Sequence, residues 1–181
     1  MKSSAFALIL FFASISVSQA QQRQLNGFLE IPWGTPPDQA RTMLEAKTQA
    51  TYDSGKSTSD KPWWHGGTFV GQPVAFFALD FTDKKLSGAF VFIKPASPGH
   101  KEEYKAFKKL LTEKYNAPTT EHTKGGHWKA EWKCSVAGSK ESAAITLENA
   151  PEAQGCKITY TLHRVMPAAG LPAKPAGKKD L

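Results

Sequence analysis

The most informative part of the chain is GQPVAFFALDFTDKKLSGAFVFI, residues 71–93. Two apolar runs flank the polar sequence TDKK, a pattern typical of a β-hairpin, and a shorter strand is expected just before it at residues 68–70. Because side chains alternate across a strand, phenylalanines fall on both faces of residues 71–81. Either helices cover one face and a loop or tail the other, or one aromatic face of the sheet meets a partner.

A helix is predicted before this hairpin, starting at the sequence WGTPPD, residues 33–38. Thr35 has the side chain of a helix cap, and Pro36 suits the first helical position. The helix is expected to end near Tyr52, because the next residues, 53–61 (DSGKSTSDK), have the composition of a polar loop.

The second half of the chain repeats this order with a clearer helix, residues 100–115. Its apolar stripe consists of Tyr104, Phe107, Leu111 and Tyr115. Three strands with regular alternation follow, near residues 128–134, 143–147 and 156–162. We therefore expect an α+β fold in which two helix-plus-antiparallel-strand units pack as one two-layer domain.

The two ends of the chain lie outside the predicted α+β domain, residues 21–166. Residues 1–20 have a short positive start, the apolar run AFALILFFA and small residues before a cleavage site after Ala20, which is typical of a signal peptide. We expect a periplasmic or secreted protein with no membrane span after cleavage. Residues 167–181 are rich in Pro, Ala and Lys, and a disordered tail is expected there.

The two cysteines, Cys134 and Cys156, both fall on the apolar face of their predicted strands. A plain meander of strands would hold them about 20 Å apart at about 3.3 Å per residue. That separation is too large for a disulfide. An exported protein with an even number of cysteines nevertheless favours pairing, and on this ground we predict a disulfide between Cys134 and Cys156.

No catalytic or cofactor motif is found in the sequence. The segment SGKST, residues 54–58, lacks the first glycine of a phosphate-binding loop and follows a predicted helix, and no Gly-x-Ser-x-Gly elbow occurs. His122 and His127 would point to opposite faces of an extended strand, whereas His127 and His163 could share a polar face. Three converging metal ligands cannot be assembled. We therefore expect no cofactor or metal and favour a protein that is not an enzyme.

The candidate binding residues on the strands are Trp63 and Trp64, within KPWWHGG. Adjacent side chains of an extended segment point in opposite directions, so one tryptophan could reach solvent and contact a sugar ring or a partner protein. The alternative is that both tryptophans close the ends of the core.

A second group of candidates consists of lysines on the predicted second helix. Lys101, Lys105 and Lys108 lie on its polar face. Together with a formal net charge of +7, they suggest a polyanion site, although a solvated lysine face explains the same pattern. Nucleic acid is disfavoured as a partner, because the tryptophans of the basic stretch KGGHWKAEWK, residues 124–133, point to the apolar side.

The order of these features resembles a loose group of small exported bacterial proteins. The resemblance rests on Trp33-Gly34-Thr35, the phenylalanine-rich hairpin, the helix within YKAFKKLLTEKYNAP, residues 104–118, and the tryptophan-containing strand after it. The plan is also similar to the repeated helix-and-sheet architecture of β-lactamase inhibitor protein and of outer-membrane assembly lipoproteins. That resemblance implies a binding protein and not an enzyme.

The sequence thus predicts an exported, non-catalytic binding or inhibitor-like module of the cell envelope. An envelope protein or a glycan is the expected partner. Two alternatives stay open: a hydrolase or metal-dependent enzyme of the envelope that uses the histidines, and a polyanion binder that uses the lysines of the second helix.

Overall fold

A computed structural model of the 181-residue chain describes residues 23–93, 100–150 and 155–164. The predicted signal peptide, residues 1–20, and the predicted tail, residues 167–181, lie outside these ranges and stay predictions. Of the helices in the described ranges, neither is long and apolar enough to cross a membrane.

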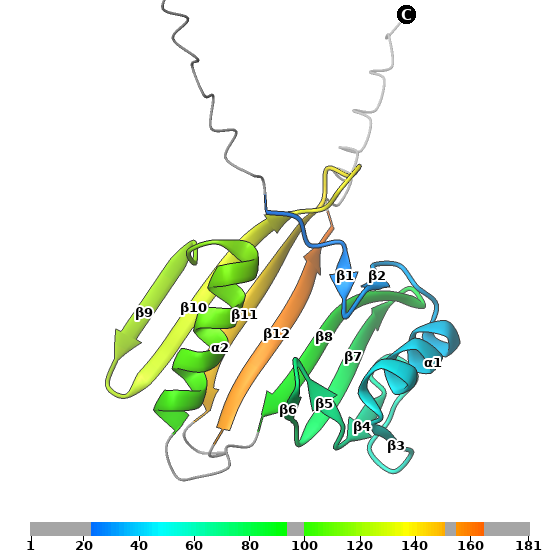
Figure 1. Ribbon diagram of the computed structural model, residues 1–181. Coiled ribbons are helices and arrows are strands. Elements are labelled where there is room, and N and C mark those ends of the chain that lie inside the picture. Colours follow the sequence, from blue (N-terminus) through cyan, green and yellow to red (C-terminus); the bar gives the residue numbers. More distant parts are fainter. Residues whose placement is uncertain (1–22, 94–99, 151–154, 165–181) are drawn as a thin grey trace, which may run out of the picture.

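The centre of the structure is one antiparallel sheet of eight strands in the order β3-β4-β7-β8-β12-β11-β10-β9 (Figure 1). Its strands are β3 (Thr51–Asp53), β4 (Trp63–His65), β7 (Phe76–Thr82), β8 (Lys85–Ile93), β9 (Thr120–Lys124), β10 (His127–Ser135), β11 (Ser142–Ala150) and β12 (Gly155–His163). Two short hairpins stand apart from this sheet and consist of β1 (Gly27–Phe28) with β2 (Ile31–Pro32) and β5 (Thr68–Phe69) with β6 (Gln72–Pro73). The helices are α1 (Pro37–Thr48) and α2 (His100–Tyr115).

The predicted fold class, a balanced α+β domain of two packed units, was wrong. The described chain is mostly β, with two helices on one continuous sheet. The halves merge because β8 pairs directly with β12, where Val91 lies opposite Ile158 and Ala89 lies opposite Tyr160. This pairing satisfies the backbone groups of two strands that would otherwise be unpaired edges.

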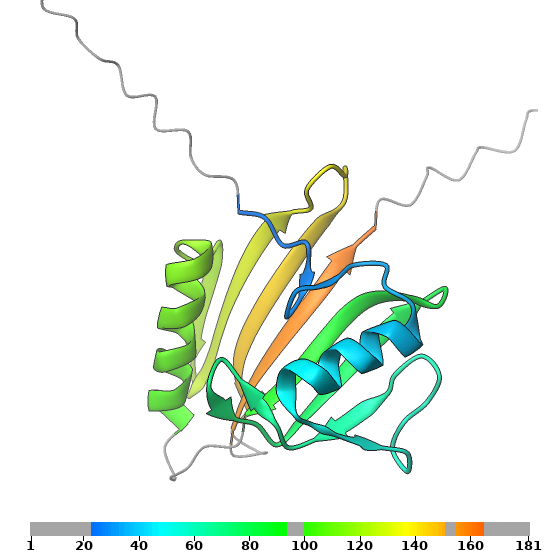
Figure 2. The ribbon, with the colours of Figure 1, turned by 45° about the vertical axis from the view of Figure 1, so that its right-hand side comes forward.

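Both helices lie on the same face of the sheet (Figures 1 and 2). Helix α1 buries Ala40 and Leu44, and α2 packs on β10, β11 and β12. The sheet residues beneath the helices include Trp64, Phe77, Leu79, Val91, Trp132, Ile145, Leu147 and Ile158, all of them fully buried. This face therefore holds the hydrophobic core, and we call it the covered face.

The structure confirms the second helix at its predicted bounds and buries its stripe of Tyr104, Phe107, Leu111 and Tyr115. It also confirms the hairpin of β7 and β8, whose turn residues Asp83 and Lys84 have φ of 52° and 56°. A turn with positive φ at both central residues has a backbone twist that matches the right-handed twist of the flanking strands.

The start of the first helix differs from the prediction. Thr35 does not cap α1, because its hydroxyl donates a hydrogen bond to the carbonyl oxygen of Pro32 at 2.7 Å. The helix ends at Thr48, where Gln49 takes the left-handed conformation. Strand β9 was not predicted, since its sequence TEHTK is exposed along its whole length and shows no apolar alternation.

The predicted disulfide is absent from the structure. Cys134 lies opposite Ala143 on β11, whereas Cys156 lies opposite Asn149 on the same strand. These positions are about 20 Å apart at about 3.3 Å per residue. Both cysteines are buried and are not joined to each other. The meander geometry therefore predicted the separation of the two cysteines correctly, and the pairing expected from the exported compartment was wrong.

The thiol content of the purified chain checks this arrangement. Burial raises the pKa of Cys134 and raises that of Cys156 to about 12, so little reactive thiolate exists near pH 8. We expect slow reaction with a thiol reagent in the folded protein. After unfolding without reductant, two thiols per chain should react, and none would react if the two cysteines were bonded.

Candidate functional site

The face of the sheet opposite the helices is the candidate functional site, and we call it the open face. None of the described helices or strands covers it (Figure 2). Strand alternation places Phe76, Phe90 and Phe92 on it, because their neighbours on the same strands, such as Phe77 and Val91, point into the core.

An aromatic patch formed by Trp63, Phe76, Phe90 and Phe92 lies on the β4-β7-β8 half of the open face. The rings of Phe76 and Phe92 stack with centroids 5.0 Å apart, and Phe90 stacks on Phe76 at 5.6 Å. The Trp63 indole lies 5.2 Å from the Phe76 ring. Phe92 is buried by these neighbours, whereas the other three rings are partly exposed. The patch is a contiguous apolar surface on rigid strands, and such surfaces are typical of binding sites.

The β9-to-β12 half of the open face is polar and carries excess positive charge. Strand register places four lysines on it (Lys124, Lys129, Lys133 and Lys157) and two glutamates (Glu131 and Glu148). Glu148 lies between two lysines and accepts from Lys129 at 3.1 Å and from Lys157 at 2.5 Å. Burial acts to raise the pKa of Glu148, but hydrogen bonds from Lys157 and Lys129 outweigh it and lower the pKa. The open face thus joins an aromatic half to a lysine-rich half.

An Asp53–His65 pair borders the aromatic patch. The Nε2 atom of His65 is hydrogen-bonded to the Asp53 carboxylate, which also accepts the backbone N–H groups of Gly55 and Lys56. Burial would raise the pKa of Asp53, but the His65 hydrogen bond and these N–H groups lower it. Within the described ranges, no serine or cysteine is hydrogen-bonded to His65. The pair therefore lacks the nucleophile of a hydrolase triad.

The structure separates the two predicted tryptophans. Trp63 lies in the aromatic patch, where Lys61 approaches its ring at 6.0 Å. Trp64 is fully buried beneath α1, and its indole N–H donates to Glu45 Oε1 at 3.0 Å. A partner can therefore contact Trp63 directly but not Trp64.

Sequence reasoning did not name Phe76, Phe90 or Phe92 as site residues. The signal that could have found them was the apolar character of both faces of the hairpin. Only one of those faces is used for the core.

The lysines predicted on the second helix lie on the surface of α2. Lys105 pairs with Glu102 at 2.9 Å, and Lys108 is hydrogen-bonded to Glu121 on β9. Lys101 is exposed. Two of these three positive charges have a carboxylate partner, so this surface attracts a polyanion less than the sequence suggests.

The histidines considered for a metal site do not converge. His163 lies opposite Ser142, which lies opposite Ser135 at the far end of β10 from His127. This places His127 and His163 about 26 Å apart at about 3.3 Å per residue. Across the described residues, no group of three His, Cys, Asp or Glu side chains is arranged to hold a metal ion.

Comparisons with protein-family models, curated proteins and solved structures found no match to this chain. The resemblance to β-lactamase inhibitor protein and to the loose group of exported proteins therefore stays a prediction.

Replacement of Glu148 by glutamine checks the charge arrangement on the open face. Because its pKa is lowered by folding, Glu148 stabilises the fold above its unfolded pKa, and this stabilisation disappears as the pH falls through the lower folded value. Glu148→Gln should lower the free energy of unfolding by about 1 kcal/mol at pH 7 and by much less near pH 3. Urea unfolding at both pH values measures this.

Glu131→Gln is the matched control, because Glu131 lies on the same face and forms no ion pair with any described residue. A loss of stability that is equal for both variants, or that is independent of pH for Glu148→Gln, would contradict the assigned role of Glu148.

Proposed function

We propose that this chain is a non-catalytic binding module of the cell envelope that holds a partner protein on the open face of its sheet. The aromatic patch of Trp63, Phe76, Phe90 and Phe92 is the observation that carries the proposal. The predicted signal peptide adds the expectation that the partner is met in the periplasm or outside the cell.

The physical properties of the patch suit an interface. Aromatic side chains supply large contact areas, and they dominate the binding energy of many protein interfaces. The rings of Phe76 and Phe90 are already stacked on one another, so they lose little conformational freedom when a partner binds. A rigid apolar centre of this kind favours binding over catalysis, which would require reactive groups at the same place.

The lysine-rich half of the open face indicates the chemistry of the partner. Lys129 and Lys157 keep 46% and 37% of their side chains exposed while sharing the single carboxylate of Glu148. Acidic groups of a partner would complement the remaining positive charge and accelerate association. The expected partner surface therefore has apolar side chains beside a group of Asp and Glu residues.

Site-specific photo-crosslinking in cells can identify the partner. A photoreactive residue at position 90, on the open face, should give one dominant protein adduct that mass spectrometry identifies. The same residue at position 110, which is exposed on α2, is the control and should not give that adduct. Equal crosslinking from both positions would contradict the proposal, and a carbohydrate adduct at position 90 would indicate a glycan ligand.

Binding measurements with the identified partner then test the patch. Phe90→Ser should weaken binding by about tenfold or more, because it removes a central ring of the apolar surface. Leu110→Ser removes an exposed apolar side chain of the other face and should leave the affinity unchanged. Circular dichroism of both variants shows whether they fold, and an unchanged affinity of folded Phe90→Ser would refute the role of the patch.

A further inference from the structure

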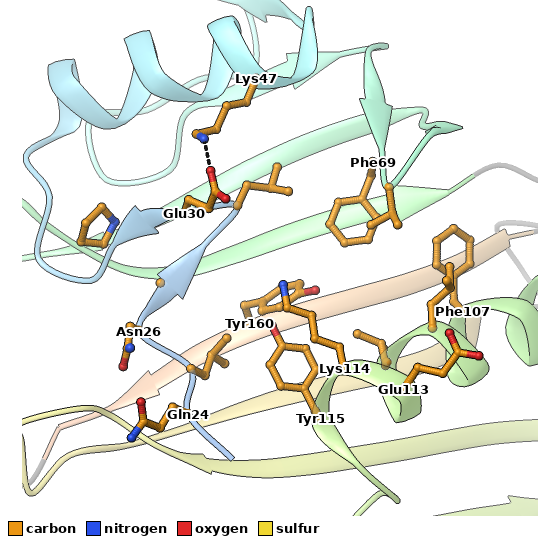
Figure 3. A pocket seen from close by; sticks show the side chains of 17 residues that line it. Gln24, Asn26, Glu30, Lys47, Phe69, Phe107, Glu113, Lys114, Tyr115 and Tyr160 are labelled. Atoms are coloured by element: carbon orange, nitrogen blue, oxygen red, sulfur yellow. Dashed lines mark hydrogen bonds and ion pairs between the residues drawn. The ribbon is translucent and has the colours of Figure 1, made fainter. Parts of the chain in front are cut away.

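A cavity of about 910 Å³ lies on the other side of the sheet, between the two helices (Figure 3). Helix α2 forms one wall, the β1 and β2 segment with the C-terminal part of α1 forms the second, and the end of β5 forms the third. Tyr160 of β12 also lines the cavity. Its volume lies near the upper end of the range of about 300–1,000 Å³ that is usual for small-molecule sites.

The lining of the cavity is mainly apolar. Its apolar side chains come from Leu25, Leu29, Phe69, Phe107, Leu110 and Leu111. Val70 and Leu110, the large hydrophobic side chains that the described chain leaves most exposed, both lie on its wall, with 56% and 38% of their surface exposed. An apolar chain in the cavity would remove these two side chains from water, which is favourable.

Two tyrosine hydroxyls in the cavity wall lack a hydrogen-bond partner. Tyr160 and Tyr115 line the cavity and are 5% and 8% exposed, and no described residue is hydrogen-bonded to either hydroxyl. The two hydroxyl oxygens are not themselves buried, so they open into the cavity and can donate to a ligand there. Burial raises the pKa of Tyr115 to about 12 and that of Tyr160 further, so both hydroxyls keep their protons near neutral pH and can donate to an acceptor.

Lys114 supplies a positive charge at this cavity, and that charge also helps to lower the pKa of Glu30. The other charged groups there are matched, since Glu30 pairs with Lys47 at 2.5 Å and Glu113 lies 3.9 Å from Lys109. Lys114 has no carboxylate within ion-pair distance among the residues described, and its ammonium lies 5.4 Å from the Tyr115 ring. The cation and the two hydroxyls therefore gather at the Tyr115 side of the cavity (Figure 3).

We propose that this cavity binds a long-chain amphiphile with a single carboxylate head, of the fatty-acid class. The apolar chain lies between α2 and the β5 wall, in contact with Phe69 and Phe107. The carboxylate lies at Lys114 and accepts hydrogen bonds from the hydroxyls of Tyr160 and Tyr115. This site is separate from the open face and does not depend on the function proposed for that face.

Isothermal titration of the purified chain with palmitate, below the concentration at which palmitate forms micelles, tests the site. We expect saturable binding of one palmitate per chain. Hexadecanol, which has the same chain and no charge, should bind about tenfold more weakly, and acetate should not bind. Absence of saturable palmitate binding to the folded chain would overturn the proposal, including the case in which another part of the chain fills the cavity.

Variants locate the bound carboxylate. Lys114→Gln should weaken palmitate binding by about tenfold, and Tyr160→Phe, which keeps the ring and removes only the hydroxyl, should weaken it by a similar factor. Lys101→Gln makes the same change of charge on α2, outside the cavity lining, and should bind like the wild type. Equal affinities of Lys114→Gln and Lys101→Gln, with folding of each verified by circular dichroism, would refute the assigned head-group site.

Phe90→Ser separates the two proposals. This variant should keep full palmitate affinity, because Phe90 lies on the opposite face of the sheet. Loss of palmitate binding in folded Phe90→Ser would show that the amphiphile occupies the open face, which contradicts the cavity proposal.

Discussion

The antiparallel pairing of β8 with β12 is the interaction on which the rest of the structure depends. It joins the β3-β4-β7-β8 strands and the β9-to-β12 strands into one sheet, with Val91 opposite Ile158 at the junction. Both residues are fully buried, so this junction also lies at the centre of the core. Without it, two long apolar strands would have exposed edges, which favour aggregation.

The same junction gives the two faces of the sheet different properties. On the covered face, the helices sit over different halves of the sheet and leave a cavity between them, beside β12. On the open face, the junction places the aromatic rings of β7 and β8 next to Lys157 of β12, and the lysines of β10 lie two strands further along the sheet. Both candidate binding sites therefore arise from one topological feature, and each combines residues from the two halves of the chain.

The aromatic patch and the cavity also differ in what they lack. The rings of the patch stack on one another and have no polar group that needs a hydrogen-bond partner, so an apolar partner surface is enough to cover them. The cavity instead contains donors without acceptors, the hydroxyls of Tyr160 and Tyr115, beside the charge of Lys114. A flat apolar surface suits a macromolecule, whereas a concave site with converging donors suits a small ligand.

The sequence by itself determined the local elements, because alternation and helical periodicity are local properties. It located the second helix, the hairpin of β7 and β8 and the buried sides of β10, β11 and β12. It did not reveal strand β9, the single sheet or the exposure of Phe76 and Phe90. Those features were decided by tertiary structure, since strand pairing and the placement of helices determine which residues meet and which apolar face is left uncovered.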